Sequence, residues 1–143
     1  MSLPAALAEI AEDFNALPEP ERLELLLEFS DNLPALPARF DGVELEQVTE
    51  CQSPVFLTVE VADDAQRTVN VFITAPPRAP TTRGFAGVLK EGLDALPAAA
   101  VLAVPDDFPS TLGLTRAVSP LRLRGMTAML GRIKRRVAAA LEG

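Results

Sequence analysis

The chain has 143 residues and a net charge of −7, with one cysteine and no histidine. This length is enough for one hydrophobic core, so residues 1–143 are predicted to form a single domain. Without histidine there can be no Ser-His-Asp or Cys-His catalytic pair, and one cysteine can form neither an intramolecular disulfide nor a multi-cysteine zinc or iron–sulfur site. The acidic charge and the absence of tryptophan and tyrosine argue against a nucleic-acid partner.

The apolar stretches of the chain are short. Residues 97–105 form one of the longest, well below the roughly 20 residues that a membrane helix needs, so no membrane partner is expected. The N-terminus has no basic segment ahead of an apolar one, which predicts no signal peptide, and the unpaired cysteine indicates the cytoplasm. Twelve of the 20 acidic residues lie in the first 50 positions. This uneven charge either serves solubility or orients a protein partner.

Two helices are predicted at the start of the chain, over residues 3–15 and 19–30. In the first, apolar residues recur every three or four positions and Ser2 is the expected N-cap. In the second, prolines stand at the start and acidic residues occupy the first turn, where they favour the helix dipole. The prolines of residues 33–37 end helical structure.

Three strands are predicted next, over residues 43–48, 54–61 and 68–74, because β-branched and apolar residues alternate there. Their short connections predict an antiparallel meander. The proline-rich residues 75–80 are expected to form a loop.

Two further helices are predicted over residues 82–96 and 120–141, with a turn at 106–112 between them. Ser119 and Pro120 are a favourable cap and first-turn pair for the last helix. The order of helices, strands and helices predicts an α+β fold, in which a three-stranded antiparallel sheet carries the N- and C-terminal helices on one face.

Cys51 falls in the connection between the first two predicted strands, where a side chain is reachable. From its surroundings in the sequence, two interpretations stay open: a small buried hydrophobe, or a thiol that reacts with a partner protein. Glu50 is expected to raise the thiol pKa. No Lys, Arg or His lies within ten residues of Cys51, so any activating cation must come from elsewhere in the fold.

The segment from Cys51 to Phe56, Cys-Gln-Ser-Pro-Val-Phe, resembles the Cys-Gln-Ser-x-Val-aromatic signature of the SufE family. Members of this family are sulfur acceptors in iron–sulfur cluster assembly. Further segments agree with the family pattern in the same order: Leu33–Leu36 with its Leu-Pro-x-Leu helix exit, Arg83-Gly84 with its basic-Gly helix start, Leu112–Leu114 with its Leu-x-Leu, and Ser119–Gly125 with its Ser/Thr-Pro-x-Arg-x-x-Gly opening of the last helix.

Two features depart from the family pattern. Glu50 stands where the family usually has a small residue, and the proline-rich residues 75–80 replace a polar loop. No role of an acidic residue in that loop is therefore carried over to this chain.

The resemblance implies that Cys51 takes persulfide sulfur from a PLP-dependent cysteine desulfurase, stimulates that enzyme, and passes the sulfur to an iron–sulfur assembly scaffold. The chain is then a sulfur-transfer partner rather than an autonomous enzyme. PLP belongs to the desulfurase, and neither a cofactor nor a metal is expected in this chain. In the family the thiol can sit in an apolar pocket and swing out on docking. Arg122 is the candidate stabiliser of the thiolate or persulfide, and Gln52, Ser53 and Arg83 are candidate loop or partner contacts.

Three other functions stay open. The chain could dock on a desulfurase and change its rate without covalent chemistry. It could be a cluster scaffold, although one cysteine and no histidine argue against that within a single chain. It could also be a single-thiol redox sensor.

Overall fold

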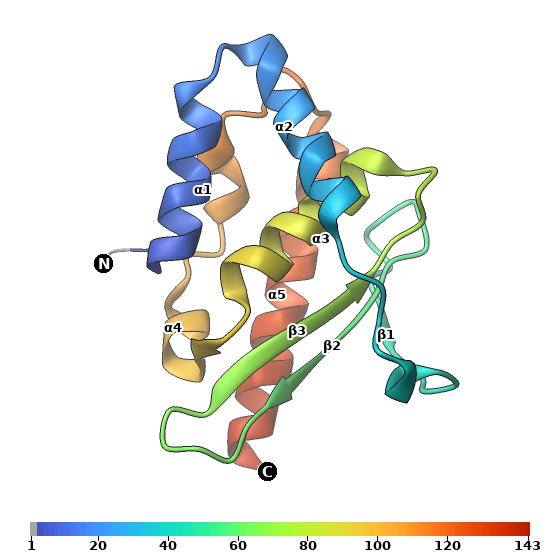
Figure 1. Cartoon of the computed structure of the whole chain (residues 1–143), viewed down its shortest axis with the longest axis vertical. Coiled ribbons are helices and arrows are strands. Elements are labelled where there is room, and N and C mark those ends of the chain that lie inside the picture. Colours follow the sequence, from blue (N-terminus) through green and yellow to red (C-terminus); the bar gives the residue numbers. More distant parts are fainter. Residues whose placement is uncertain (1–2) are drawn as a thin grey trace.

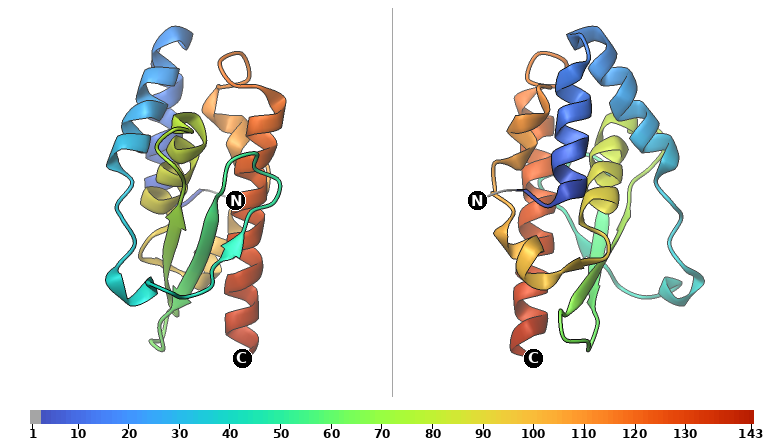
Figure 2. Two further views of the ribbon diagram at one scale, coloured as in Figure 1. Left: turned by 90° about the vertical axis from the view of Figure 1, so that its right-hand side faces the viewer. Right: turned by 60° about the vertical axis from the view of Figure 1, so that its left-hand side comes forward.

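The helices of the protein lie on one side of an antiparallel sheet (Figure 1). The computed structural model describes residues 3–143. Helices α3 (Pro80–Leu93) and α5 (Pro120–Glu142) pack against the sheet, and α1 (Ala5–Ala16) and α2 (Glu19–Asn32) pack against α3. Two further views show α5 running along the length of the molecule beside the strands (Figure 2). The predicted α+β architecture is confirmed.

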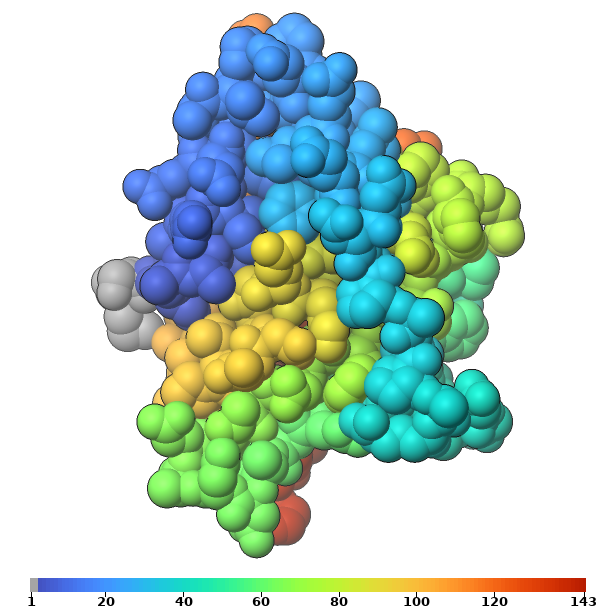
Figure 3. Space-filling view, viewed as in Figure 1, coloured from blue at the N-terminus to red at the C-terminus, as the bar shows by residue number. Residues whose placement is uncertain are grey.

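The two N-terminal helices follow the predicted pattern closely. Leu7, Ile10 and Phe14 are the buried residues of α1, because positions three and four apart share one face of a helix. The expected cap Ser2 lies outside the described residues, and Pro4 occupies the N-cap position. Pro18 precedes α2, which has acidic residues in its first turn. In the space-filling view this helical pair covers the upper part of the molecule (Figure 3).

The sheet has four strands within the described residues, in the order β1-β2-β3-β4, and every neighbouring pair is antiparallel. The central pair is β2 (Phe56–Val61) and β3 (Thr68–Thr74). Strand β3 matches its predicted range, and β2 begins two residues later than predicted. Strand β1 is limited to Glu46–Gln47, shorter than the predicted residues 43–48. The predicted meander is therefore correct, but the predicted number of three strands is wrong.

The fourth strand, β4 (Leu96–Pro97), begins where a helix was predicted. Helix α3 ends at Leu93, and Ala95 adopts a positive φ of 65° that turns the chain toward the sheet. The Ala95 N–H then donates to the carbonyl of Val69 on β3 at 2.8 Å. Pairing with the edge of β3 thus takes over the end of a segment whose apolar spacing also fitted a helix.

Three short elements complete the chain. A 3₁₀ turn, η1 (Ala38–Phe40), lies in the segment that leads from α2 to β1. Helix α4 (Ala98–Ala103) was not predicted, and its alanine-rich sequence is a strong helix former. The predicted turn at 106–112 is confirmed as the 3₁₀ element η2 (Phe108–Leu112). Among residues 3–143, no helix combines the length and the hydropathy that crossing a membrane requires.

Helices α2 and α3 approach each other so closely that two glycines are required between them. A Cβ atom at position 84 would lie 2.5 Å from the carbonyl oxygen of Leu26, and one at position 87 would overlap the carbonyl oxygen of Phe29. Glycine weakens an isolated helix by about 1 kcal/mol relative to alanine. In this helix the loss is offset by close packing against α2, and Gly84 and Gly87 are both buried.

Arg83 fastens the same region together. Its guanidinium donates to the main-chain carbonyls of Ser30 at 3.0 Å, Leu33 at 3.2 Å and Ala75 at 2.8 Å. These three carbonyls belong to the end of α2, the chain that leaves it, and the end of β3. Arg83 therefore joins the helical layer to the sheet.

Candidate functional site around Cys51

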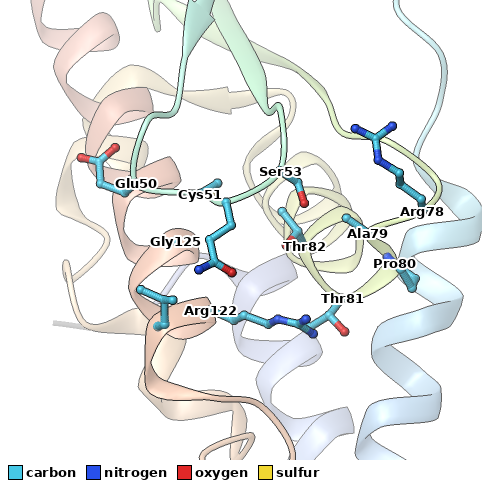
Figure 4. Close-up of a pocket in the computed structure, with 12 residues that line it drawn as sticks. Glu50, Cys51, Ser53, Arg78, Ala79, Pro80, Thr81, Thr82, Arg122 and Gly125 are labelled. Atoms are coloured by element: carbon cyan, nitrogen blue, oxygen red, sulfur yellow. The ribbon is translucent and has the colours of Figure 1, made fainter.

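A cavity of about 170 Å³ opens beside Cys51, where three segments distant in the sequence meet (Figure 4). One wall comes from the loop before β2, a second from the loop before α3 and its first turn, and the third from the first turns of α5. The lining residues in these three walls are, respectively, Glu50–Ser53, Arg78–Thr82, and Leu121, Arg122 and Gly125.

The loop that carries Cys51, here called the Cys51 loop (residues 48–55), begins and ends in the core. Val48 and Val55 are fully buried, and the Val48 N–H donates to the Val55 carbonyl at 2.8 Å. Within the loop the Cys51 N–H donates to the Val48 carbonyl at 3.1 Å. Two buried valines therefore anchor a short turn that lays Cys51 against α5.

The thiol of Cys51 is partly buried and packs on Gly125 of α5. A Cβ atom at position 125 would lie only 3.1 Å from the Cys51 sulfur, closer than such contacts normally come. The missing side chain of Gly125 thus creates the space in which the thiol sits.

The surroundings of the thiol favour its protonated form. The pKa of Cys51 is raised to about 11, mainly by burial and further by the negative charge of Glu50, whereas the charge of Arg132 acts to lower it. Only the thiolate is a good nucleophile. Cys51 is therefore mostly protonated at neutral pH in this structure.

Arg132 on α5 contacts three side chains of β1 and the Cys51 loop. Its Nη1 donates to Glu46 at 2.7 Å, and its Nη2 donates to Glu50 at 2.7 Å and to Thr49 Oγ1 at 3.1 Å. Its Nε also donates to Glu50, at 3.1 Å. We call these contacts the Arg132 network. Arg136 adds one further hydrogen bond to Glu46, at 3.1 Å.

The network changes the titration of both acids. Burial acts to raise the pKa of Glu46, but hydrogen bonds from Arg132 and Arg136 outweigh burial and lower the pKa below its ordinary value. The hydrogen bond from Arg132 likewise lowers the pKa of Glu50. Both carboxylates are therefore charged at neutral pH.

Sequence reasoning missed Arg132, although a signal for it was present. Gly125 and Arg132 are seven residues apart, which is two helical turns, so both lie on the same face of α5. The face of α5 that contacts the thiol through Gly125 therefore also carries Arg132, the cation whose charge acts to lower the thiol pKa. Arg78 was also missed, because it is a single cation inside a proline-rich loop.

Arg122, the cation predicted from the sequence, lines the cavity on its α5 wall. Its side chain extends toward Thr81 at the start of α3, on the opposite side of the Cys51 loop from Glu50 (Figure 4). The main-chain N–H of Arg122 donates to Ser119 Oγ at 3.3 Å, which confirms Ser119 as the cap of α5. A role of Arg122 in stabilising a thiolate or persulfide stays a prediction.

The other predicted residues divide between two places. Gln52 and Ser53 line the cavity beside Cys51. Arg83 does not line it, and its guanidinium is held by the three carbonyls described above. Within residues 3–143, no cluster of three or more His, Cys, Asp or Glu residues is arranged to hold a metal ion.

Comparison with known proteins identifies the class to which this fold and this thiol belong. The family model described as "Fe-S metabolism associated domain" (SufE) matches residues 8–137. The chain belongs to the SufE family, which is associated with iron–sulfur metabolism.

Individual relatives agree with this assignment. An uncharacterized SufE-like protein of Mycobacterium tuberculosis is 54% identical over 139 residues, which cover 97% of this chain and 96% of the relative. SufE-like protein 1, chloroplastic/mitochondrial, of Arabidopsis thaliana is 34% identical over 129 residues, 90% of this chain and 33% of that protein. The solution structure of a hypothetical protein from Thermus thermophilus superposes with a TM-score of 0.86 at 39% identity, covering 99% of this chain and all of the other.

Proposed function

We propose that Cys51 accepts sulfur as a persulfide from a PLP-dependent cysteine desulfurase and passes it to an iron–sulfur cluster assembly scaffold. One observation carries this proposal: the only cysteine of a SufE-family chain lies at an open cavity, on a loop between two strands.

The transfer is a thiol exchange in which one sulfur atom passes from the desulfurase cysteine to Cys51. The Cys51 thiolate attacks the terminal sulfur of a persulfide on the desulfurase cysteine, and a bond forms between the Cys51 sulfur and that terminal sulfur. The S–S bond of the donor breaks, and its electron pair leaves with the desulfurase thiolate. The terminal sulfur keeps its proton, so no external oxidant or reductant takes part. This step needs no general base, in keeping with a chain that lacks histidine.

Activation of the thiol is the step that the resting structure opposes. With a pKa of about 11, Cys51 is almost entirely protonated at neutral pH. Moving the Cys51 loop off α5 removes the burial that is the main cause of this raised pKa. We therefore propose that docking of the desulfurase exposes Cys51, and that the cavity shelters the persulfide once the loop returns.

The partners in this proposal are two proteins. PLP is held by the desulfurase, and this chain uses no cofactor of its own. The recipient of the sulfur is the scaffold on which the iron–sulfur cluster is assembled, and the exchange takes place in the cytoplasm. Arg122 and Arg78, both exposed at the cavity, are the proposed cations for the partner and the persulfide.

The decisive experiment incubates the protein with a cysteine desulfurase and cysteine labelled with radioactive sulfur. We expect label on the wild-type chain that is released by a reducing thiol, and none on Cys51→Ser. Covalent label on the serine variant would show that Cys51 is not the acceptor. Full stimulation of the desulfurase by Cys51→Ala, without label on the wild type, would instead favour a docking module that acts allosterically.

A further inference from the structure

We propose that Arg132 is the positioning residue of Cys51, which holds the Cys51 loop closed on α5 and sets how often the thiol becomes reachable. The proposal rests on the proposed function only in treating Cys51 as the sulfur acceptor. The contacts that support it are independent of that function.

The first support is the placement of the Arg132 network in the chain. Thr49 and Glu50 immediately precede Cys51, and both accept hydrogen bonds from Arg132. Glu46, on β1, accepts a third from the same guanidinium at 2.7 Å. One side chain of α5 therefore holds both the strand that leads into the loop and the two residues next to the thiol.

The second support is the shared face of α5. Gly125 provides the seat of the thiol, and Arg132 lies two turns further along the same face. When Arg132 holds Thr49 and Glu50, the following residue is directed onto Gly125. The Arg132 side chain is 17% exposed, so it lies under the loop rather than extending into solvent.

The third support is the nature of its partners. The Glu50 side chain is flexible and 47% exposed. A group on a docking protein can therefore reach Glu50 and take the place of Arg132 as its partner. The buried main chain of Val48 and Val55 needs no change when Glu50 is released. Loss of the Arg132–Glu50 contact can therefore let the loop move away from α5 while the sheet stays folded.

Arg132 acts on the thiol in two opposite ways, so the direction in which its removal changes the alkylation rate of Cys51 tests the proposal. Its positive charge favours the thiolate, so loss of the charge alone slows alkylation of Cys51. Its hydrogen bonds keep the thiol buried, so loss of the bonds exposes Cys51 and accelerates alkylation. If positioning dominates, removing Arg132 increases the rate.

The experiment measures alkylation of Cys51 by iodoacetamide, an uncharged reagent, in the free protein at neutral pH. We expect Arg132→Gln to react about fivefold faster than wild type, which is the scale of a lost surface ion-pair network. Arg132→Lys should lie between the two, because one ammonium group replaces only part of the fork of a guanidinium. Arg136→Gln is the matched control: it removes the same charge and contacts Glu46 alone, so its rate should stay within about twofold of wild type.

Hydrogen exchange gives a second readout that does not depend on the ionisation of the thiol. In Arg132→Gln the amides of residues 49–53 should exchange faster, whereas those of β2 and β3 should not change. An unchanged or slower alkylation rate, or unchanged exchange in the loop, would overturn the proposal. Thr49→Val removes one bond without changing charge and should also react faster, so the proposal remains falsifiable if Arg132→Gln does not fold. Neither assay contains a desulfurase, so failure here is distinct from failure of the sulfur-acceptor function.

Discussion

Two arginines each hold separate parts of this protein together, but their partners differ in kind. Arg83 donates to three main-chain carbonyls between α2, α3 and β3. Arg132 donates to three side chains, those of Glu46, Thr49 and Glu50. A carbonyl can leave such a bond only if the backbone moves, whereas a surface carboxylate can rotate away. The α2–α3 junction is therefore held by main-chain contacts, whereas the Cys51 loop is held by side-chain contacts, which our proposal treats as reversible.

The energies of the two arrangements follow the same division. A buried polar group that loses its partner costs about 1–3 kcal/mol. A surface ion pair contributes about 0–1 kcal/mol, because water solvates both groups when they separate. If Cys51 passes sulfur to a partner as proposed, the second kind of contact at the thiol lets its loop move while the first kind keeps the rest of the fold in place.

The largest effect is expected at the α2–α3 junction. Gly87→Val places side-chain atoms on the main chain of Phe29, so we expect a loss of about 3 kcal/mol in the free energy of unfolding. Denaturation by urea measures it. Gly131→Ala on α5 is the control, because its Cβ would meet only the tip of Arg135 at 3.5 Å, and helix propensity should then leave stability unchanged or raised by up to about 1 kcal/mol. A Gly87→Val protein as stable as wild type would mean that the junction is not tightly packed.

The next effect compares the two arginines directly. Arg83→Met leaves three carbonyls without their donor, and we expect a loss of about 2 kcal/mol. Arg132→Met breaks contacts with the exposed residues Thr49 and Glu50 and with the partly buried Glu46, which keeps its hydrogen bond from Arg136. We expect a loss below about 1 kcal/mol in the same urea experiment. Equal losses for the two variants would remove the distinction between a fixed and a reversible fastening.

The smallest effect concerns the titration of Cys51. Glu50 raises the thiol pKa through its negative charge, so Glu50→Gln should shift the thiolate titration to lower pH. Thiolate absorbance in the ultraviolet, followed as pH rises, measures the midpoint. As a control, Glu44→Gln removes an exposed acid just before β1 and should leave the midpoint unchanged. A midpoint that stays fixed or rises in Glu50→Gln would show that Glu50 does not act on the thiol.

Much of the fold was predictable because local patterns and tertiary packing agree. The apolar spacing of Leu7, Ile10 and Phe14 predicted α1, and Ser119 and Pro120 predicted the start of α5. Prediction failed at Leu96, where helical spacing and strand pairing competed. The exposed edge of β3 decided that competition, and no local pattern describes an edge formed by another segment.

The sequence by itself determined the single thiol, the absence of histidine, and a resemblance that directed attention to Cys51. The sequence also associated Arg122 with the site, because Cys51 and Arg122 each belong to a motif that resembles the family pattern. Only the tertiary structure decided how reactive the thiol is at rest. Burial against α5 and the charge of Glu50 raise the thiol pKa, and the charge of Arg132 opposes them. Arg132 lies far from Cys51 along the chain, and a side-chain contact over that separation exists only once helix and sheet have packed together.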